Sequence, residues 1–100
     1  LLYGYSLAKD NIYKKNQIIV TEGYLDVVML HQAGFNNAVA TLGTALTQEH
    51  LPILKRGNPK IIVAYDGDKA GLNAAFKASK LLSHSDFEGG VIIFPQGVDP

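Results

Sequence analysis

Carboxylates that follow apolar runs are the side chains in this sequence best placed to do chemistry. Asp66 and Asp68 come two apart after one such run, Glu22 follows another, and Asp99 lies shortly after a third. Clustered carboxylates serve either as an acid/base pair or as ligands for a hard cation such as Mg²⁺, which prefers oxygen ligands. The pattern therefore predicts a site for Mg²⁺ or Mn²⁺ wherever the ends of these runs meet.

Each of these residues also has a purely structural interpretation. Asp68 is then the N-cap of the next helix, Asp66 is a solvated turn residue, and Glu22 is a polar residue that ends a strand. The recurrence of acids at three such ends favours the metal interpretation. Lys69, directly after the aspartate pair, is the best candidate for a phosphate partner, and a solvated lysine in a first helical turn is the alternative.

Charge and residue usage exclude several other kinds of site. Nine basic and nine acidic residues give a net charge of zero, so any nucleic-acid binding must come from local groups such as Lys14 and Lys15. A solvated basic turn is the favoured interpretation of these two lysines. The absence of cysteine excludes disulfides and thiolate zinc sites. Three histidines lack the i, i+4 spacing of a helical metal pair and are interpreted as ordinary surface or helix residues: His31, His50 and His84.

The length of 100 residues corresponds to one domain. No apolar stretch reaches the roughly 18 residues that a membrane span requires, so no membrane association is expected. The opening "LLYGYSLAKD" has neither the basic region nor the long apolar region of a secretory signal. Since the first residue is not Met, the chain is expected to be a piece of a longer cytoplasmic protein.

The elements that must position the acids follow from the apolar runs. Four runs do not alternate polar with apolar residues, as is typical of parallel strands covered on both faces: residues 17–21, 38–41, 61–65 and 90–94. Helices are predicted before and between them: residues 2–13, 25–33, 47–56 and 69–82. With right-handed crossovers, this order predicts a three-layer α/β sandwich with a mostly parallel four-stranded sheet.

Two of these helices carry specific expectations. The helix over residues 25–33 is expected to turn one apolar stripe toward the sheet, made of Leu25, Val28, Met29 and Ala33. The helix over residues 47–56 is expected to start at an N-cap, Thr47, although Pro52 falls just past its first turn and removes a backbone hydrogen bond.

Several motifs in order resemble the Toprim module of bacterial DnaG-type DNA primases. They are "VTEGYLDVVMLHQAGFNNAVATLGTALT", "IIVAYDGDKAG" and "FPQGVDP", and the resemblance covers nearly the whole chain. It implies the Toprim fold, with residues 1–100 as the catalytic core fragment of a larger primase. Residues 1–16 are then a lead-in helix, and residues 17–100 are the β-α-β-α-β-α-β core.

The resemblance also implies roles by position. Glu22 of "EGYLD" matches the Toprim glutamate, a general acid/base or metal-site residue, and Asp66 and Asp68 match the Mg²⁺-binding pair. Asp99 of "GVDP" matches the first aspartate of an Asp-Pro-Asp motif. Because the sequence stops at Pro100, the metal site is expected to be incomplete here.

By resemblance, the activity is metal-dependent nucleotidyl transfer that makes short RNA primers on a single-stranded DNA template during replication. The implied partners are the template, ribonucleoside triphosphates, primer RNA and the replicative helicase, which binds through a domain outside this chain. Zinc belongs to another separate domain. The expected place is the bacterial replisome, and the isolated 100 residues are expected to be inactive.

Other interpretations remain open at this stage. A phosphatase of the haloacid-dehalogenase type also uses Asp-x-Asp, but that family places the pair after its first strand and continues with Thr or Val. Another Toprim module is the main alternative: a non-enzymatic recombination mediator, a nuclease or a topoisomerase. "EGYLD" together with "LGTALT" favours the primase.

Overall fold

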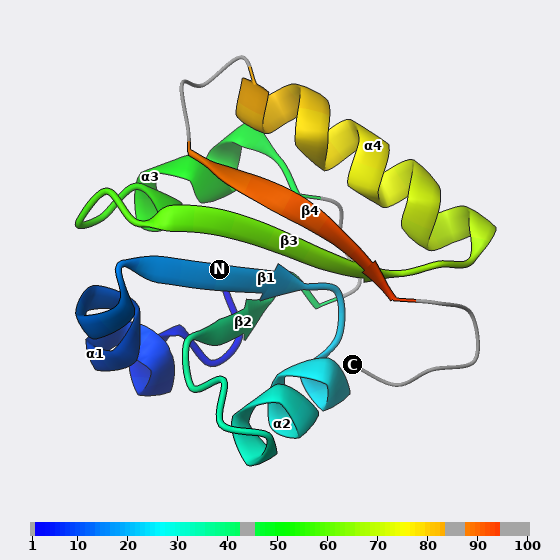
Figure 1. Ribbon diagram of the computed structural model, residues 1–100. Helices are drawn as coiled ribbons and strands as arrows, with labels where there is room; N and C mark the ends of the chain where they lie inside the picture. The colour runs from blue at the N-terminus through cyan, green and yellow to red at the C-terminus, as the bar shows by residue number, and fades with distance from the viewer. Residues whose placement is uncertain (1, 43–45, 84–87, 95–100) are drawn as a thin grey trace.

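The computed structural model describes residues 2–42, 46–83 and 88–94, which fold around a single sheet (Figure 1). Their helices and strands are, in chain order, α1 (Tyr5–Lys15), β1 (Gln17–Thr21), α2 (Tyr24–Gln32), β2 (Ala38–Ala40), the 3₁₀ helix η1 (Gln48–His50), α3 (Leu51–Leu54), β3 (Lys60–Asp66), α4 (Lys69–Ser83) and β4 (Gly89–Phe94). All four predicted strands are present, each within one residue of the predicted ends.

The sheet has the order β2-β1-β3-β4, and every pairing between these strands is parallel. The two central strands, β1 and β3, are in a register that sets Val20 opposite Val63. All carboxyl ends therefore lie at one edge of the sheet. The predicted α/β class and parallel sheet are confirmed.

Helices cover both faces of the sheet, because successive side chains of each strand point to opposite faces. On one face, α1, α3 and α4 bury a core with inward side chains of β1, β2 and β3. Its largest fully buried members are Ile12, Ile18, Leu54, Ile61, Val20, Val39 and Val63. On the other face, Leu30 of α2 packs with Ile19, Ala38 and Ala64. Figure 1 shows α4 alongside β3 and β4, with α2 at the opposite side of the sheet.

The predicted helix over residues 47–56 is divided. A 3₁₀ turn, η1, leads into the short helix α3, and Pro52 lies in the first turn of α3, where its missing N–H would have no intrahelical partner. Thr47 is the N-cap residue of η1, as predicted, and its backbone N–H donates to Nδ1 of His50 at 3.0 Å. Proline thus sets the point at which the tighter turn becomes an α-helix.

The predicted apolar stripe of α2 is wrong. Val27 and Leu30 are the buried residues of this helix, whereas Leu25 is 61% exposed and Val28 is 39% exposed. Apolar residues occur around most of α2, so the sequence offers two candidate faces one residue apart. Periodicity alone could not choose between them.

The longest helix, α4, approaches the sheet through small residues. Gly71, Ala75, Ala78 and Leu82 are its buried side, and a Cβ at Gly71 would overlap the carbonyl oxygen of Asp66. Glycine at this position lets the helix start immediately beside the end of β3. Even this helix falls short of a bilayer, and nothing else among the described helices has the length and apolar character to cross one.

Candidate metal centre

Glu22 is positioned by the end of β1. Val20 of β1 is paired with Val63 of β3. Glu22 lies two residues beyond Val20, and Tyr65 lies two residues beyond Val63, at the corresponding position of the neighbouring strand. The hydroxyl of the fully buried Thr21 donates to the carbonyl of Val39 at 3.2 Å, which ties this strand end to β2. Glu22 therefore directly follows a strand end that is tied into the sheet, at its carboxyl edge.

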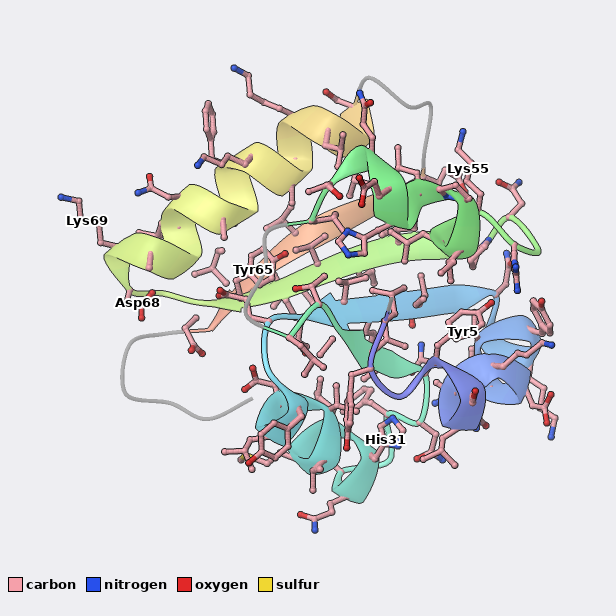
Figure 2. All side chains as sticks on the ribbon, turned by 180° about the vertical axis from the view of Figure 1, so that it is seen from behind. Tyr5, His31, Lys55, Tyr65, Asp68 and Lys69 are labelled. Carbon is pink, nitrogen blue, oxygen red and sulfur yellow. The ribbon has the colours of Figure 1, made fainter. Side chains whose placement is uncertain are left out.

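The aspartate pair is positioned by the turn between β3 and α4. Asp66 is the last residue of β3 and is exposed. Asp68 caps α4: its Oδ1 accepts from the N–H of Gly71 at 2.6 Å, and its carbonyl accepts from the N–H of Leu72 at 2.9 Å. The structural interpretation of Asp68 as a helix cap is therefore correct for Oδ1. Figure 2 shows Asp68 and Lys69 together at this edge, with Tyr65 nearby on β3.

The electrostatics of Glu22 show that the acids share one environment. Burial is the largest cause that raises the pKa of the Glu22 carboxyl, and the charges of Asp66 and Asp68 raise it further. A fourth carboxylate, Asp26, contributes in the same direction. The fold thus brings Glu22, Asp66 and Asp68 close enough to repel, while Asp99 lies outside the described residues.

Two residues of this site were missed in the sequence. Asp26, four residues after Glu22, accepts from the N–H of Gly23 through Oδ2 at 3.3 Å in the first turn of α2. Tyr65 is only 2% exposed, and burial, with the charge of Glu22 second, raises its pKa to about 12. Asp26 is the second acidic residue of the motif "EGYLD", so the sequence could have indicated it. Tyr65 ends an apolar run and could not be distinguished from an ordinary strand residue.

The donor set fits a hard divalent cation by its chemistry. It offers carboxylate oxygens that repel one another, and a cation relieves that repulsion. Within residues 2–42, 46–83 and 88–94, no three acidic or histidine side chains form a ready-made cage. Mg²⁺ usually binds through only one or two carboxylates and keeps several waters, so a cage is not required.

Comparison with known proteins agrees with this arrangement. Residues 19–100 match the Toprim-like family. A DNA primase of Helicobacter pylori (strain J99) is 66% identical over 100 residues, which is all of this chain and 18% of the relative. The Aquifex aeolicus primase structure, with zinc-binding and RNA polymerase domains, superposes with a TM-score of 0.88 at 39% identity, over 99% of this chain and 25% of that one.

A structure of the DnaG primase catalytic domain bound to single-stranded DNA is similar as well, with a TM-score of 0.84 and 41% identity over 99% of this chain and 33% of that one. The chain thus spans about a fifth of the length of its primase relatives. The family match covers more than four-fifths of the chain and includes every residue of the acidic edge. The chain belongs to the Toprim-like family.

Proposed function

We propose that this chain is the Toprim catalytic core of a bacterial DNA primase, with residues 1–16 as its lead-in helix and residues 17–100 as its core. The observation that carries the proposal is the meeting of Glu22 with Asp66 and Asp68 at one sheet edge, in a chain 66% identical to a DNA primase. The reaction is metal-dependent nucleotidyl transfer, which extends a short RNA primer on a single-stranded DNA template.

Each acidic residue has a role in this proposal. Asp66 and the uncapped oxygen of Asp68 hold Mg²⁺ or Mn²⁺, and Asp99 belongs to the same ligand set. When bound, the cation neutralises phosphate charge and polarises the phosphoryl group. Glu22, whose pKa is raised by burial and by its neighbours, either takes up a proton from the attacking hydroxyl or completes the metal site.

The surroundings of the acids suggest two further roles. Lys69 is exposed at the first position of α4, next to Asp68, where its ammonium can meet the phosphates of an incoming ribonucleoside triphosphate. Tyr65 keeps its hydroxyl proton at neutral pH, because its pKa is about 12, and adds no charge to the site. The acids alone therefore set the negative charge of the edge.

The remaining partners belong to the longer protein that we propose. The template and the primer RNA engage this core together with other parts of the protein, and a domain beyond this chain contacts the replicative helicase. Zinc belongs to another domain, in keeping with the zinc-binding domain named in the Aquifex aeolicus structure. The place of action is the bacterial replisome in the cytoplasm.

A chimera tests the proposal. Residues 1–100 replace the matching segment of the Helicobacter pylori primase, and primer synthesis is measured on single-stranded DNA with ribonucleoside triphosphates and Mg²⁺. We expect the chimera to make primers, Asp66→Asn to abolish synthesis, and the matched control Lys9→Gln on α1 to retain it. A folded chimera without synthesis, or full synthesis by Asp66→Asn, would contradict the proposal. The 100 residues alone are expected to make none.

A further inference from the structure

The outer face of α4 carries an unusual set of exposed residues. Leu72 is 50% exposed and Phe76 is 64% exposed, and three lysines and an asparagine are exposed around them. At 100° per residue, all six fall within an arc of about 140°. We call this arc the α4 ridge; it consists of Lys69, Leu72, Asn73, Phe76, Lys77 and Lys80.

The charge of the α4 ridge is of one sign. The helix contains three lysines and no acidic residue, although the whole chain is neutral. From Lys69 to Lys80 the cations extend over about 17 Å of helix axis. A row of positive charge over this length is complementary to a phosphate backbone.

The aromatic residue of the ridge is next to one of these cations. The ammonium of Lys80 lies 5.3 Å from the centroid of the Phe76 ring. Nothing in the core requires Phe76, because α4 packs on β3 and β4 through its opposite, small-residue side. A large exposed ring beside a cation is the combination that stacks a base and contacts the adjoining phosphate.

The ridge is continuous with the candidate metal centre. Lys69, its first residue, directly follows Asp68, and the axis of α4 runs away from the acidic edge along β3 (Figure 2). We propose that the α4 ridge binds single-stranded nucleic acid, with Lys69, Lys77 and Lys80 on phosphates and Phe76 stacked on a base. This inference rests on the proposed function and assigns one path by which the nucleic acid leaves the candidate metal centre.

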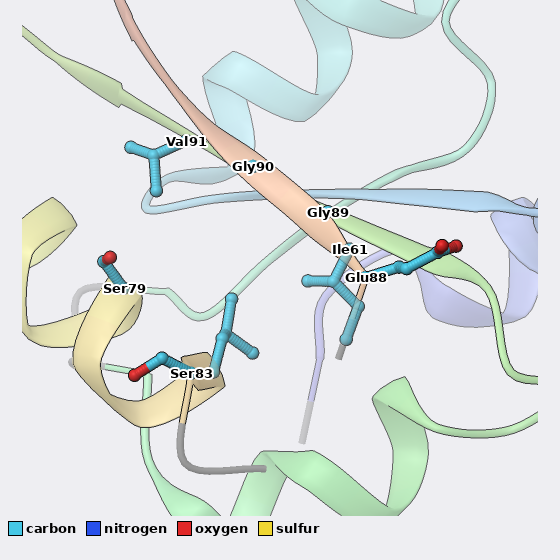
Figure 3. A pocket seen from close by; sticks show the side chains of 8 residues that line it. Ile61, Ser79, Ser83, Glu88, Gly89, Gly90 and Val91 are labelled. Carbon is cyan, nitrogen blue, oxygen red and sulfur yellow. The ribbon is translucent and has the colours of Figure 1, made fainter. Parts of the chain in front are cut away.

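A hollow lies at the other end of the same helix. It has a volume of about 190 Å³ and is lined by residues of α4, β3 and β4, including Ser79, Ser83 and Gly90 (Figure 3). Its lining offers two hydroxyls and one carboxylate, Glu88, but no cation. A phosphate would meet the negative charge of Glu88 there with no cation to offset it, which makes the hollow a poorer site than the α4 ridge.

The test measures binding of the 100-residue chain to fluorescein-labelled oligo(dT) of about 15 nucleotides, long enough to cover the ridge. Fluorescence anisotropy is recorded in chelator at several salt concentrations. For Lys77→Gln/Lys80→Gln we expect a loss of about tenfold in affinity at low salt, and a salt slope about 1.4 less steep, because two phosphate contacts are removed. The matched control, Lys9→Gln/Lys60→Gln, removes the same charge from exposed positions on α1 and at the start of β3.

Stacking is tested separately at Phe76. Phe76→Leu keeps an apolar side chain without a flat ring and is expected to weaken binding at least fivefold, whereas Phe76→Trp is expected to restore it. The inference is overturned if the α4 double variant loses no more affinity than the Lys9→Gln/Lys60→Gln control. Equal binding by Phe76→Leu, or binding that is independent of salt, overturns it as well and indicates a protein-docking face.

Failure of this inference can be separated from failure of the proposed function. Thermal melts with and without Mn²⁺ report on the acidic edge alone, and the ridge variants are expected to keep the full Mn²⁺ response. Asp66→Asn is expected to lose that response while its DNA affinity in chelator does not fall. A ridge variant that loses its Mn²⁺ response contradicts the separation of the two sites.

Discussion

The backbone N–H of Gly71 donates to Oδ1 of Asp68 at 2.6 Å, so the same carboxylate caps the start of α4 and adds to the charge that acts on Glu22. Asp66, two residues earlier, is exposed at the end of β3 and has no such role in a helix. The two aspartates therefore differ in what they contribute to stability, although they look equivalent in the sequence.

The first prediction uses this difference. In chelator, Asp66→Asn is expected to melt at the same or a higher temperature, because it removes one of the charges that act on Glu22. Asp68→Ala is expected to lose about 1 kcal/mol with the cap, or roughly 4–8 °C of Tm. Asp68→Ser, which retains a capping oxygen, is the control and should recover most of that loss.

The same aspartate variants carry a second prediction with metal. At about 100 times its Kd, Mn²⁺ should stabilise the parent by about 2.7 kcal/mol. Asp66→Asn and Asp68→Ser are expected to lose most of this gain, because each removes a carboxylate that we propose as a metal ligand. Differential scanning calorimetry in chelator and then in Mn²⁺ measures it. An unchanged response in both variants would mean that the aspartates bind no metal.

The pH dependence of stability gives a third prediction, at Glu22. Its folded-state pKa is raised above the ordinary 4.5, so the folded protein holds a proton that the unfolded chain releases. That contribution is fully present below pH 4.5 and is lost as the pH rises through the folded pKa. Glu22→Gln should therefore gain in Tm over the parent as the pH rises through this window. Glu49→Gln, which removes a carboxylate on η1, controls for a general effect of charge; a flat difference for Glu22→Gln would contradict the prediction.

A fourth prediction follows from Tyr65. Titration by tyrosinate absorbance should show a tyrosine near pH 12 that is missing from Tyr65→Phe. Glu22→Gln should lower this pKa only partly, because burial is the larger cause and the Glu22 charge the smaller. The associated stability is present below pH 10 and is lost as the pH rises toward 12. A Tyr65 titration that does not move in Glu22→Gln would mean that the two groups are apart.

The close approach of α4 to β3 gives a fifth prediction. Gly71→Ala places a Cβ against backbone, which cannot move aside as a flexible side chain can. We expect a loss of about 3 kcal/mol or more and a Tm lower by at least 12 °C or so. Gly90→Ala on β4 is the control, because no atom lies within 4 Å of its added Cβ. Equal melting of the two variants would contradict the packing described for α4.

The strands and the sheet were predictable because their information is local. Runs such as residues 61–65 are short, β-branched and apolar without alternation, which is typical of a strand covered on both faces. The order of elements then leaves few topologies, since crossovers are right-handed. The placement of Glu22 and Asp66 at one edge followed from that topology alone.

Other features depended on tertiary context that the sequence does not display. Whether α2 turns Val27 or Val28 inward is decided by the sheet it meets, and both faces of the helix are apolar. Asp26 joins the site because it lies in the first turn of α2, close enough to Glu22 for its charge to raise the pKa of the Glu22 carboxyl. The raised pKa of Tyr65 depends on burial of its hydroxyl, and the sequence does not distinguish this from ordinary core packing.

The strand order β2-β1-β3-β4 has a consequence for how the molecule is made. The acidic edge requires β1 to pair with β3, so Glu22 and Asp66 meet only after 44 further residues have been synthesised. At typical bacterial elongation rates this takes roughly 2–9 s. During that time the helix and strand that follow Glu22 can form, but the central pairing cannot. The chain therefore acquires its local structure early in translation and its acidic edge late, and mutations that slow the β1–β3 pairing should delay formation of this edge more than they delay helix formation.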